Sequence, residues 1–105
     1  MTLGITQLPW TYATPLTVAN SPLVSPWLEA SPYHTMILPW FSFAGGTSTH
    51  TIEGSFDGVN LDADFNYAAP TSGTAFNIIS PYFRWKTVQT VGDATKSKVV
   101  LRPKL

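Results

Sequence analysis

The sequence contains no cysteine and little charge. Only 11% of its 105 residues are Asp, Glu, Lys or Arg, and the formal net charge is zero. Without cysteine, neither a disulfide framework nor a thiolate metal site can stabilise the fold. A surface with so few charges is poorly suited to keeping a monomer soluble, so we expect part of it to contact other protein.

Long apolar runs and a secretion signal are also missing. No apolar stretch approaches the roughly 20 residues that a membrane-spanning helix needs, and the first four residues, MTLG, lack the basic start of a signal peptide. We therefore expect a protein that is made in a cytoplasm and has no membrane partner. A chain of this length forms one small domain, and a hydrophobic content of 44% can fill its single core.

Apolar residues alternate with polar ones along most of the chain, and no segment has a helical period. Turn residues such as Gly45-Gly46 and Pro70 to Gly73 separate the alternating segments. The predicted strands are residues 24–30, 33–43, 47–56, 59–67, 74–79, 82–91 and 96–102. Strands at such regular spacing predict an all-β fold, a single antiparallel β-sandwich of the jelly-roll or immunoglobulin-like type.

The clearest alternation lies on either side of Asp57-Gly58. Before this pair, Ile52 and Phe56 fall on one side of an extended chain, and after it residues 59–67 alternate apolar residues with Asn and Asp. Asp-Gly supplies the positive φ angle that a tight turn needs. The segment therefore predicts a β-hairpin with one face in the core and one in water.

The two C-terminal predicted strands carry most of the basic residues. Alternation directs Phe83 and Trp85 into the core from one strand, and Val99 and Leu101 from the other. If the two strands pair, their outward side chains form a basic stripe that contacts cross-strand acids or an acidic neighbour. The residues predicted for this surface contact are Arg84, Lys86, Lys98 and Arg102. A pI near 6.7 gives no long-range attraction for phosphate, so nucleic acid is not expected as a partner.

The first half of the chain is almost uncharged and is interrupted by proline. Up to Thr51 its single formally charged side chain is Glu29, and proline keeps it from forming long helices. We predict an extended arm over residues 1–20, followed by a sandwich domain over residues 21–105. The arm is expected to lie either on its own sheet or on a neighbouring subunit. The arm side chains predicted to bind a partner are Leu8, Trp10, Tyr12 and Leu16.

Residues that could carry chemistry are sparse. Three aspartates and an asparagine within residues 57–64 could offer oxygen ligands, but they fall on the solvent face of a predicted strand, and no glutamate completes a calcium loop. His34 and His50 lack the spacing of zinc ligands, and no G-x-S-x-G motif is present. We therefore expect no catalytic residue, no metal and no cofactor, and the chain is not expected to be an enzyme.

Three segments together resemble the small β-sandwich found in many tailed-phage virion proteins. They are EGSFDGVN at residues 53–60, ISPYFRWKT at residues 79–87 and SPWLEASPY at residues 25–33. The resemblance implies a non-enzymatic structural protein of the virion, a capsid decoration (cement) protein or a tail or connector component. It further implies the major capsid protein or another virion protein as partner. A homo-oligomer such as a trimer is expected on grounds of symmetry.

Parts of the same pattern recur in carbohydrate-binding sandwiches, which leaves glycan binding as the alternative function. Exposed aromatic rings in such modules stack on sugars. The aromatic residues that could do so here are Trp10, Trp27, Tyr33, Trp40 and Tyr82. Burial in the core is the competing role for aromatic residues in so small a domain.

Overall fold

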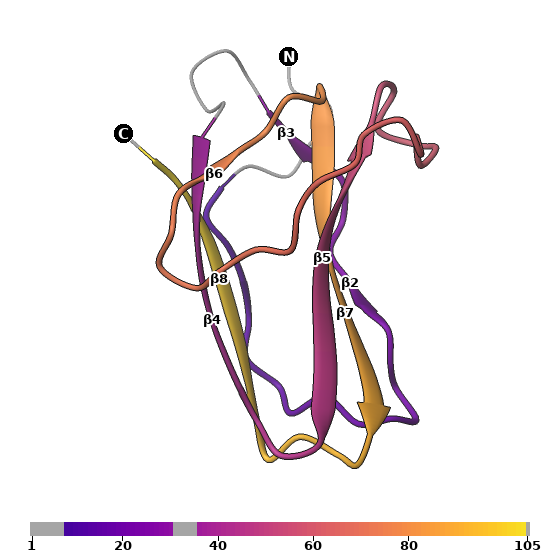
Figure 1. Cartoon of the computed structure of the whole chain (residues 1–105), viewed down its shortest axis with the longest axis vertical. Helices are drawn as coiled ribbons and strands as arrows, with labels where there is room; N and C mark the ends of the chain where they lie inside the picture. The colour runs from indigo at the N-terminus through magenta and orange to yellow at the C-terminus, as the bar shows by residue number, and fades with distance from the viewer. Residues whose placement is uncertain (1–7, 31–35, 105) are drawn as a thin grey trace.

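The computed structural model describes residues 8–30 and 36–104, and these residues form eight strands and no helix. The strands are β1 (Trp10–Tyr12), β2 (Leu23–Val24), β3 (Leu28–Glu29), β4 (Met36–Ala44), β5 (Thr47–Ser55), β6 (Phe76–Asn77), β7 (Tyr82–Val91) and β8 (Lys96–Pro103). They build two antiparallel sheets that face each other, as Figure 1 shows. The predicted all-β sandwich is therefore confirmed.

The two sheets differ in their central strands. Sheet A is organised on β7, which pairs with β5 along one edge and with β2 and β3 along the other. Sheet B has the order β1-β8-β4-β6. Because β7 and β8 lie in different sheets, they do not form the single basic stripe that their pairing would have produced. The condition set for that stripe is therefore not met, since the four-residue connection from Gly92 to Thr95 crosses from one sheet to the other.

The core lies between the sheets and is filled by alternate residues of the central strands. Phe83 and Trp85 of β7 and Val99 and Leu101 of β8 are fully buried, as their alternation predicts. The ring of Phe41 on β4 lies 5.0 Å from that of Trp85, centroid to centroid, and so joins the two sheets. Aromatic contacts of this kind add to the free energy gained from burial alone.

Two chain connections cross between the sheets at the same end of the molecule (Figure 1). Gly45 and Gly46, between β4 and β5, have φ angles of 90° and 68°, and a Cβ at Gly46 would collide with the carbonyl oxygen of Val91. The buried Gln89 amide donates hydrogen bonds to the carbonyl oxygens of Gly45 (3.1 Å) and Gly92 (2.8 Å). These bonds hold the two connections together.

The predicted hairpin around Asp57-Gly58 is wrong beyond the turn. Gly58 has the expected positive φ of 73°, but residues 59–67 form no strand and β5 pairs with β7 instead. Aspartate side chains take the backbone donors that a strand ladder would use: Asp57 accepts from the backbone N–H of Val59, and Asp62 from that of Asp64. Alternation alone does not reveal this competition.

The described part of the predicted arm belongs to the sandwich. Residues 10–12 form β1, which pairs with β8, and Leu8, Trp10 and Tyr12 pack against the core. Leu16 is only 1% exposed, and its backbone N–H donates to the Ser97 hydroxyl at 2.9 Å. Of the two surfaces proposed for the arm, its own sheet is the one that residues 8–20 cover. A partner role for these four side chains stays a prediction, and the side chain of Leu16 is already used by its own core.

We predict that Phe83→Ala lowers the free energy of unfolding by about 3–5 kcal/mol, because it leaves a cavity between the sheets. Phe56→Ala is the matched control, since Phe56 is 65% exposed, and it should cost less than about 1 kcal/mol. Urea unfolding followed by tryptophan fluorescence measures both values. Equal losses for the two variants would contradict this assignment of the core.

Candidate functional site

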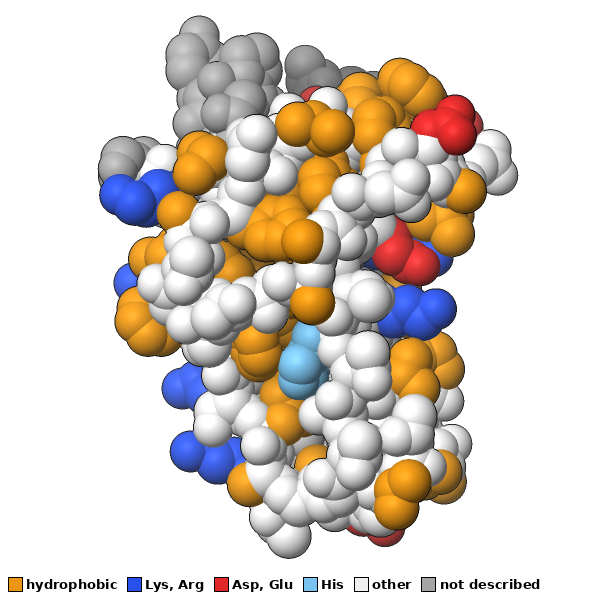
Figure 2. Space-filling view, viewed as in Figure 1, with side chains coloured by type: hydrophobic (Ala, Val, Ile, Leu, Met, Phe, Trp, Pro, Cys, Tyr) orange, Lys and Arg blue, Asp and Glu red, His pale blue; other side chains and the backbone are white. Residues whose placement is uncertain are grey.

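The outer face of sheet B gathers basic side chains around one exposed tryptophan. The inward side chains of β8 are buried, so every second residue points to solvent, and the paired β4 residues point the same way. We call this surface the basic face and define it by Leu38, Trp40, Ser42, Lys96, Lys98, Val100 and Arg102. Figure 2 shows basic side chains along the left edge of the molecule, where β4 and β8 lie in Figure 1.

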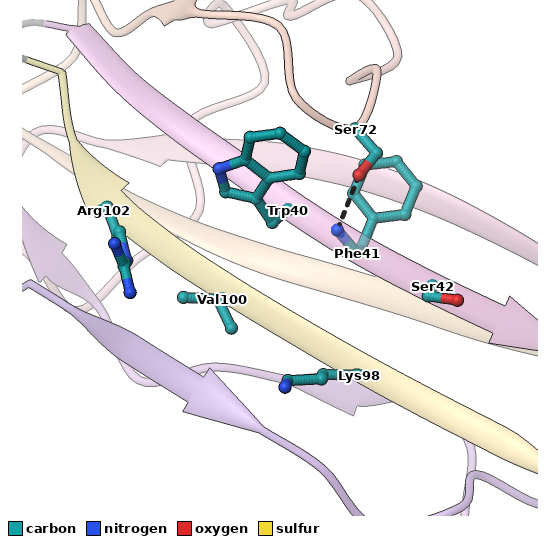
Figure 3. A pocket seen from close by; sticks show the side chains of 7 residues that line it. All are labelled: Trp40, Phe41, Ser42, Ser72, Lys98, Val100 and Arg102. Carbon is teal, nitrogen blue, oxygen red and sulfur yellow. Dashed lines mark hydrogen bonds between the residues drawn. The ribbon is translucent and has the colours of Figure 1, made fainter.

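A shallow hollow of about 480 Å³ lies in the basic face. Figure 3 shows Lys98, Val100 and Arg102 in line along β8, with Trp40 beside them on β4. Trp40 pairs across the strands with Val100 and is 51% exposed, which is high for a side chain of this size. The centre of the hollow is therefore apolar, and its two ends are cationic.

The loop after Pro70 holds Trp40 in place. Ser72 accepts a hydrogen bond from the backbone N–H of Phe41 at 2.9 Å, and the Gly73 N–H donates to the Pro39 carbonyl oxygen at 2.7 Å. The backbone of Gly73 (φ 78°) lies so close to the indole that an added Cβ would come within 2.9 Å of it. The ring is thus fixed before any ligand arrives, which lowers the entropy lost on binding.

The charge of the basic face is not neutralised within sheet B. None of its four strands contains an acidic residue, and within residues 8–30 and 36–104 no ion pair involves Lys96, Lys98 or Arg102. Lys98 and Arg102 are four residues apart on one strand, which separates them by about 13 Å. The hollow is suited to an extended acidic ligand, because Lys98 and Arg102 at its two ends are too far apart to hold one small anion together.

The outer face of sheet A has the opposite character, because both basic residues of this sheet lie beside an acidic residue. Glu53 on β5 accepts a 2.7 Å hydrogen bond from Arg84 and lies 3.9 Å from the Lys86 ammonium group. Arg84 also lies over the Trp27 ring, 4.3 Å from its centroid. Of the four residues predicted for surface contact, the structure therefore places Lys98 and Arg102 on the basic face and the other two on the opposite face. The contact of Arg84 and Lys86 with Glu53 of the neighbouring strand agrees with the cross-strand acid that the sequence analysis gave as one of two alternatives.

No protein family model, no curated protein sequence and no solved structure matches this chain. The resemblance to virion proteins therefore stays a prediction. The described residues include no helix of the length and apolar character that crossing a membrane requires.

The acidic segment after β5 is a loop held by its own side chains. Asp57 accepts hydrogen bonds from the backbone N–H groups of Asn60 and Val59, both at 2.9 Å, and these hold the pKa of its carboxyl group well below the usual range. Its second oxygen accepts from the Asn60 amide. In the described part of the chain, no group of three or more His, Cys, Asp or Glu residues is arranged to hold a metal ion.

His50 lies between aromatic rings at the open side of the sandwich, where Figure 2 shows a histidine in the gap between the sheets. Its ring is 4.7 Å from that of Phe41 and 4.6 Å from that of Phe43. Its Nδ1 atom is 2.9 Å from the Thr87 hydroxyl, which already accepts the Trp85 indole N–H. A neutral imidazole accepts the Thr87 proton there, whereas a protonated one cannot. This is a packing role, as expected for a structural histidine; His34 and Tyr33 lie outside the described residues.

The sequence did not single out Trp40 from the other aromatic residues. Trp85 is buried, Trp10 and Trp27 are half-buried, and only Trp40 is exposed on a flat strand surface. One signal was available: Trp40 shares an alternation with Leu38 and Ser42, opposite to that of the buried Ile37 and Pro39. The neighbouring strand could not be read from the sequence, because the pairing of β4 with β8 joins segments about 60 residues apart.

We predict that acid destabilises the protein partly through His50. Burial lowers its pKa below the ordinary 6.5, so the unfolded chain binds the proton more tightly than the folded one does. This contribution to stability is complete above pH 6.5 and is lost as the pH falls towards the folded pKa, by less than about 1.4 kcal/mol per pH unit. Urea unfolding of wild type and His50→Gln at pH 7 and pH 5 measures it. The variant should lose less stability than wild type over this range, and parallel losses would contradict the prediction.

Proposed function

We propose that this chain is a non-enzymatic structural protein of a tailed-phage virion, a capsid decoration protein that attaches through its basic face. The single observation that supports an attachment role is the unequal charge of the two outer faces. Sheet A neutralises its own charges, whereas Lys96, Lys98 and Arg102 of sheet B have no acidic partner within the described residues. Such a face favours an acidic protein surface.

The virion setting of this proposal comes from the sequence resemblance, and the attachment mechanism comes from the geometry. A flat sheet surface with one fixed aromatic ring and flanking cations resembles the centre and rim of many protein interfaces. One such contact is weak, since exposed ion pairs contribute about 0.2–1 kcal/mol each. Repetition over a symmetric shell makes weak contacts effective, because many copies share one surface.

This attachment differs from the arm mechanism that the sequence suggested. The side chains of Leu8, Trp10 and Tyr12 pack against their own core, and Leu16 is buried there. They are therefore less available to a neighbour than Trp40, which is half-exposed. We therefore place the contact on the basic face and not on the arm.

We predict that Lys98→Gln with Arg102→Gln weakens association with virion shells that lack this protein by about tenfold, or about 1.4 kcal/mol. Thr49→Glu with Thr51→Glu is the matched control, because it also lowers the net charge by two but lies on the exposed outer side of β5. Co-sedimentation at low and high salt measures both variants, and wild-type binding should weaken with salt.

The control should bind like wild type. Equal binding by all three proteins, or equal loss in both variants, would contradict attachment through the basic face. Binding of a single-stranded oligonucleotide that depends on Lys98 and Arg102 would instead identify the face as a nucleic-acid site.

Carbohydrate binding is the second candidate, and the exposure of Trp40 in the hollow is the observation that favours it. We predict that, if this function holds, Trp40→Ala abolishes retention on an acidic polysaccharide in affinity electrophoresis. Tyr82→Phe serves as the control, since it keeps an aromatic ring on the other sheet. Retention of both variants would count against a glycan site at Trp40. A wild type that is not retained would count against it as well.

A further inference from the structure

The loop between β5 and β6 presents an apolar and acidic tip that nothing else in the described chain covers. Phe56, Val59 and Leu61 are 65%, 74% and 52% exposed, respectively. Single exposed apolar residues are ordinary, but three large ones within six positions mark an interaction site. We call residues 56–64 the acidic loop, because Asp57, Asp62 and Asp64 flank these side chains.

The acidic loop has a defined shape. Besides the bonds to Asp57, the Ser55 hydroxyl accepts the backbone N–H of Gly58 at 3.0 Å, and the Asp62 N–H donates to the Gly54 carbonyl oxygen at 3.0 Å. The Phe56 ring packs against that of Phe65, with 4.8 Å between centroids. A loop fixed in this way loses little conformational entropy when it docks.

The acidic loop and the basic face are complementary in charge and in chemical character. One presents apolar side chains bordered by aspartates, and the other presents Trp40 and Val100 bordered by Lys98 and Arg102. The net charge of zero conceals this division: three of the six acids lie in the acidic loop, and three of the six bases lie on β8. An acidic tip is repelled by anionic lipid and by nucleic acid, which leaves a basic protein surface as its partner.

The two surfaces lie on different sides of the molecule. In Figure 1 the acidic loop follows β5 at the upper right, and β8 and β4 lie at the left; Figure 2 shows acidic and apolar side chains at that upper right corner. The loop is therefore directed away from the basic face of its own chain.

We propose that the acidic loop of one copy docks on the basic face of a second copy, so that chains join head to tail. The inference rests on the proposed function, since it gives the same basic face a second copy as its partner in the free protein, and the shell competes with that copy for the face. A contact between two different surfaces is heterologous, and it gives a ring when the rotation closes and an open chain when it does not. A ring of three would also agree with the trimer expected from symmetry.

Complementation between two variants tests this arrangement. Lys98→Gln with Arg102→Gln removes the charge of the face and keeps the loop, whereas Val59→Lys with Asp64→Lys removes the tip and keeps the face. Val59 and Asp64 contribute only their backbone N–H groups to the hydrogen bonds of the described loop, so the loop should keep its shape. Sedimentation equilibrium measures the mass of each protein alone and of the mixture.

Wild type should gain mass with concentration and lose that gain in high salt. Each variant alone should stay at 11.5 kDa, and the equimolar mixture should form a species of twice that mass and no larger. A wild type that stays monomeric at its highest soluble concentration overturns the inference. Self-association that persists in either variant, or a mixture that stays monomeric, overturns it as well.

A spin label gives a second measurement that does not depend on the variants above. The chain has no cysteine, so Ala63→Cys places one nitroxide in the acidic loop. The spin-labelled variant is mixed with ¹⁵N-enriched wild type that carries no spin label. The label should broaden the amide NMR signals of Trp40 and Val100 and leave those of Thr49 and Thr51 sharp. Uniform or absent broadening overturns the docking. Loss of shell binding in the face variant without any self-association would leave the proposed function standing and reject this inference alone.

Discussion

The alternation of side chains along β7 and β8 is the constraint on which the distribution of charge depends. Burial of Phe83 and Trp85 fixes the inner side of β7, and burial of Val99 and Leu101 fixes that of β8. The basic residues between them must then face outward, because a one-residue shift would place charges in the core. The same burial that stabilises the sandwich therefore exposes its cations.

The partners of those cations depend on which strand lies beside them. Beside β7 lies β5, which supplies Glu53 to Arg84 and Lys86. Beside β8 lies β4, which supplies Trp40 and Ser42 and no acid. Two strands of similar pattern thus produce a neutral outer face and a basic one, and the neutral net charge of the chain is a poor guide to either.

Hydrogen bonds from the backbone to aspartate side chains explain why alternation predicted some strands correctly and one segment wrongly. For β7 the predicted range of residues 82–91 agrees with the structure, and β5 and β8 agree to within one residue. Residues 59–67 alternate as clearly, yet Asp57 and Asp62 bind the backbone donors locally and the segment becomes a loop. The sequence also left open which surface the arm covers. The proline content of the arm indicates only that it is extended, and β1 of the arm pairs with β8, which lies near the other end of the sequence.

The sequence by itself determined the all-β class, the positions of most strands and the inward direction of Phe83, Trp85, Val99 and Leu101. These follow from a period of two and from burial, both of which act over a few neighbouring residues. Only the tertiary structure decided that β7 and β8 lie in different sheets, that Trp40 stands beside Lys98 and Arg102, and that the acidic loop points away from them. Pairing joins residues that are far apart in the chain, and the free energy that selects one partner strand comes from the packing of the whole core.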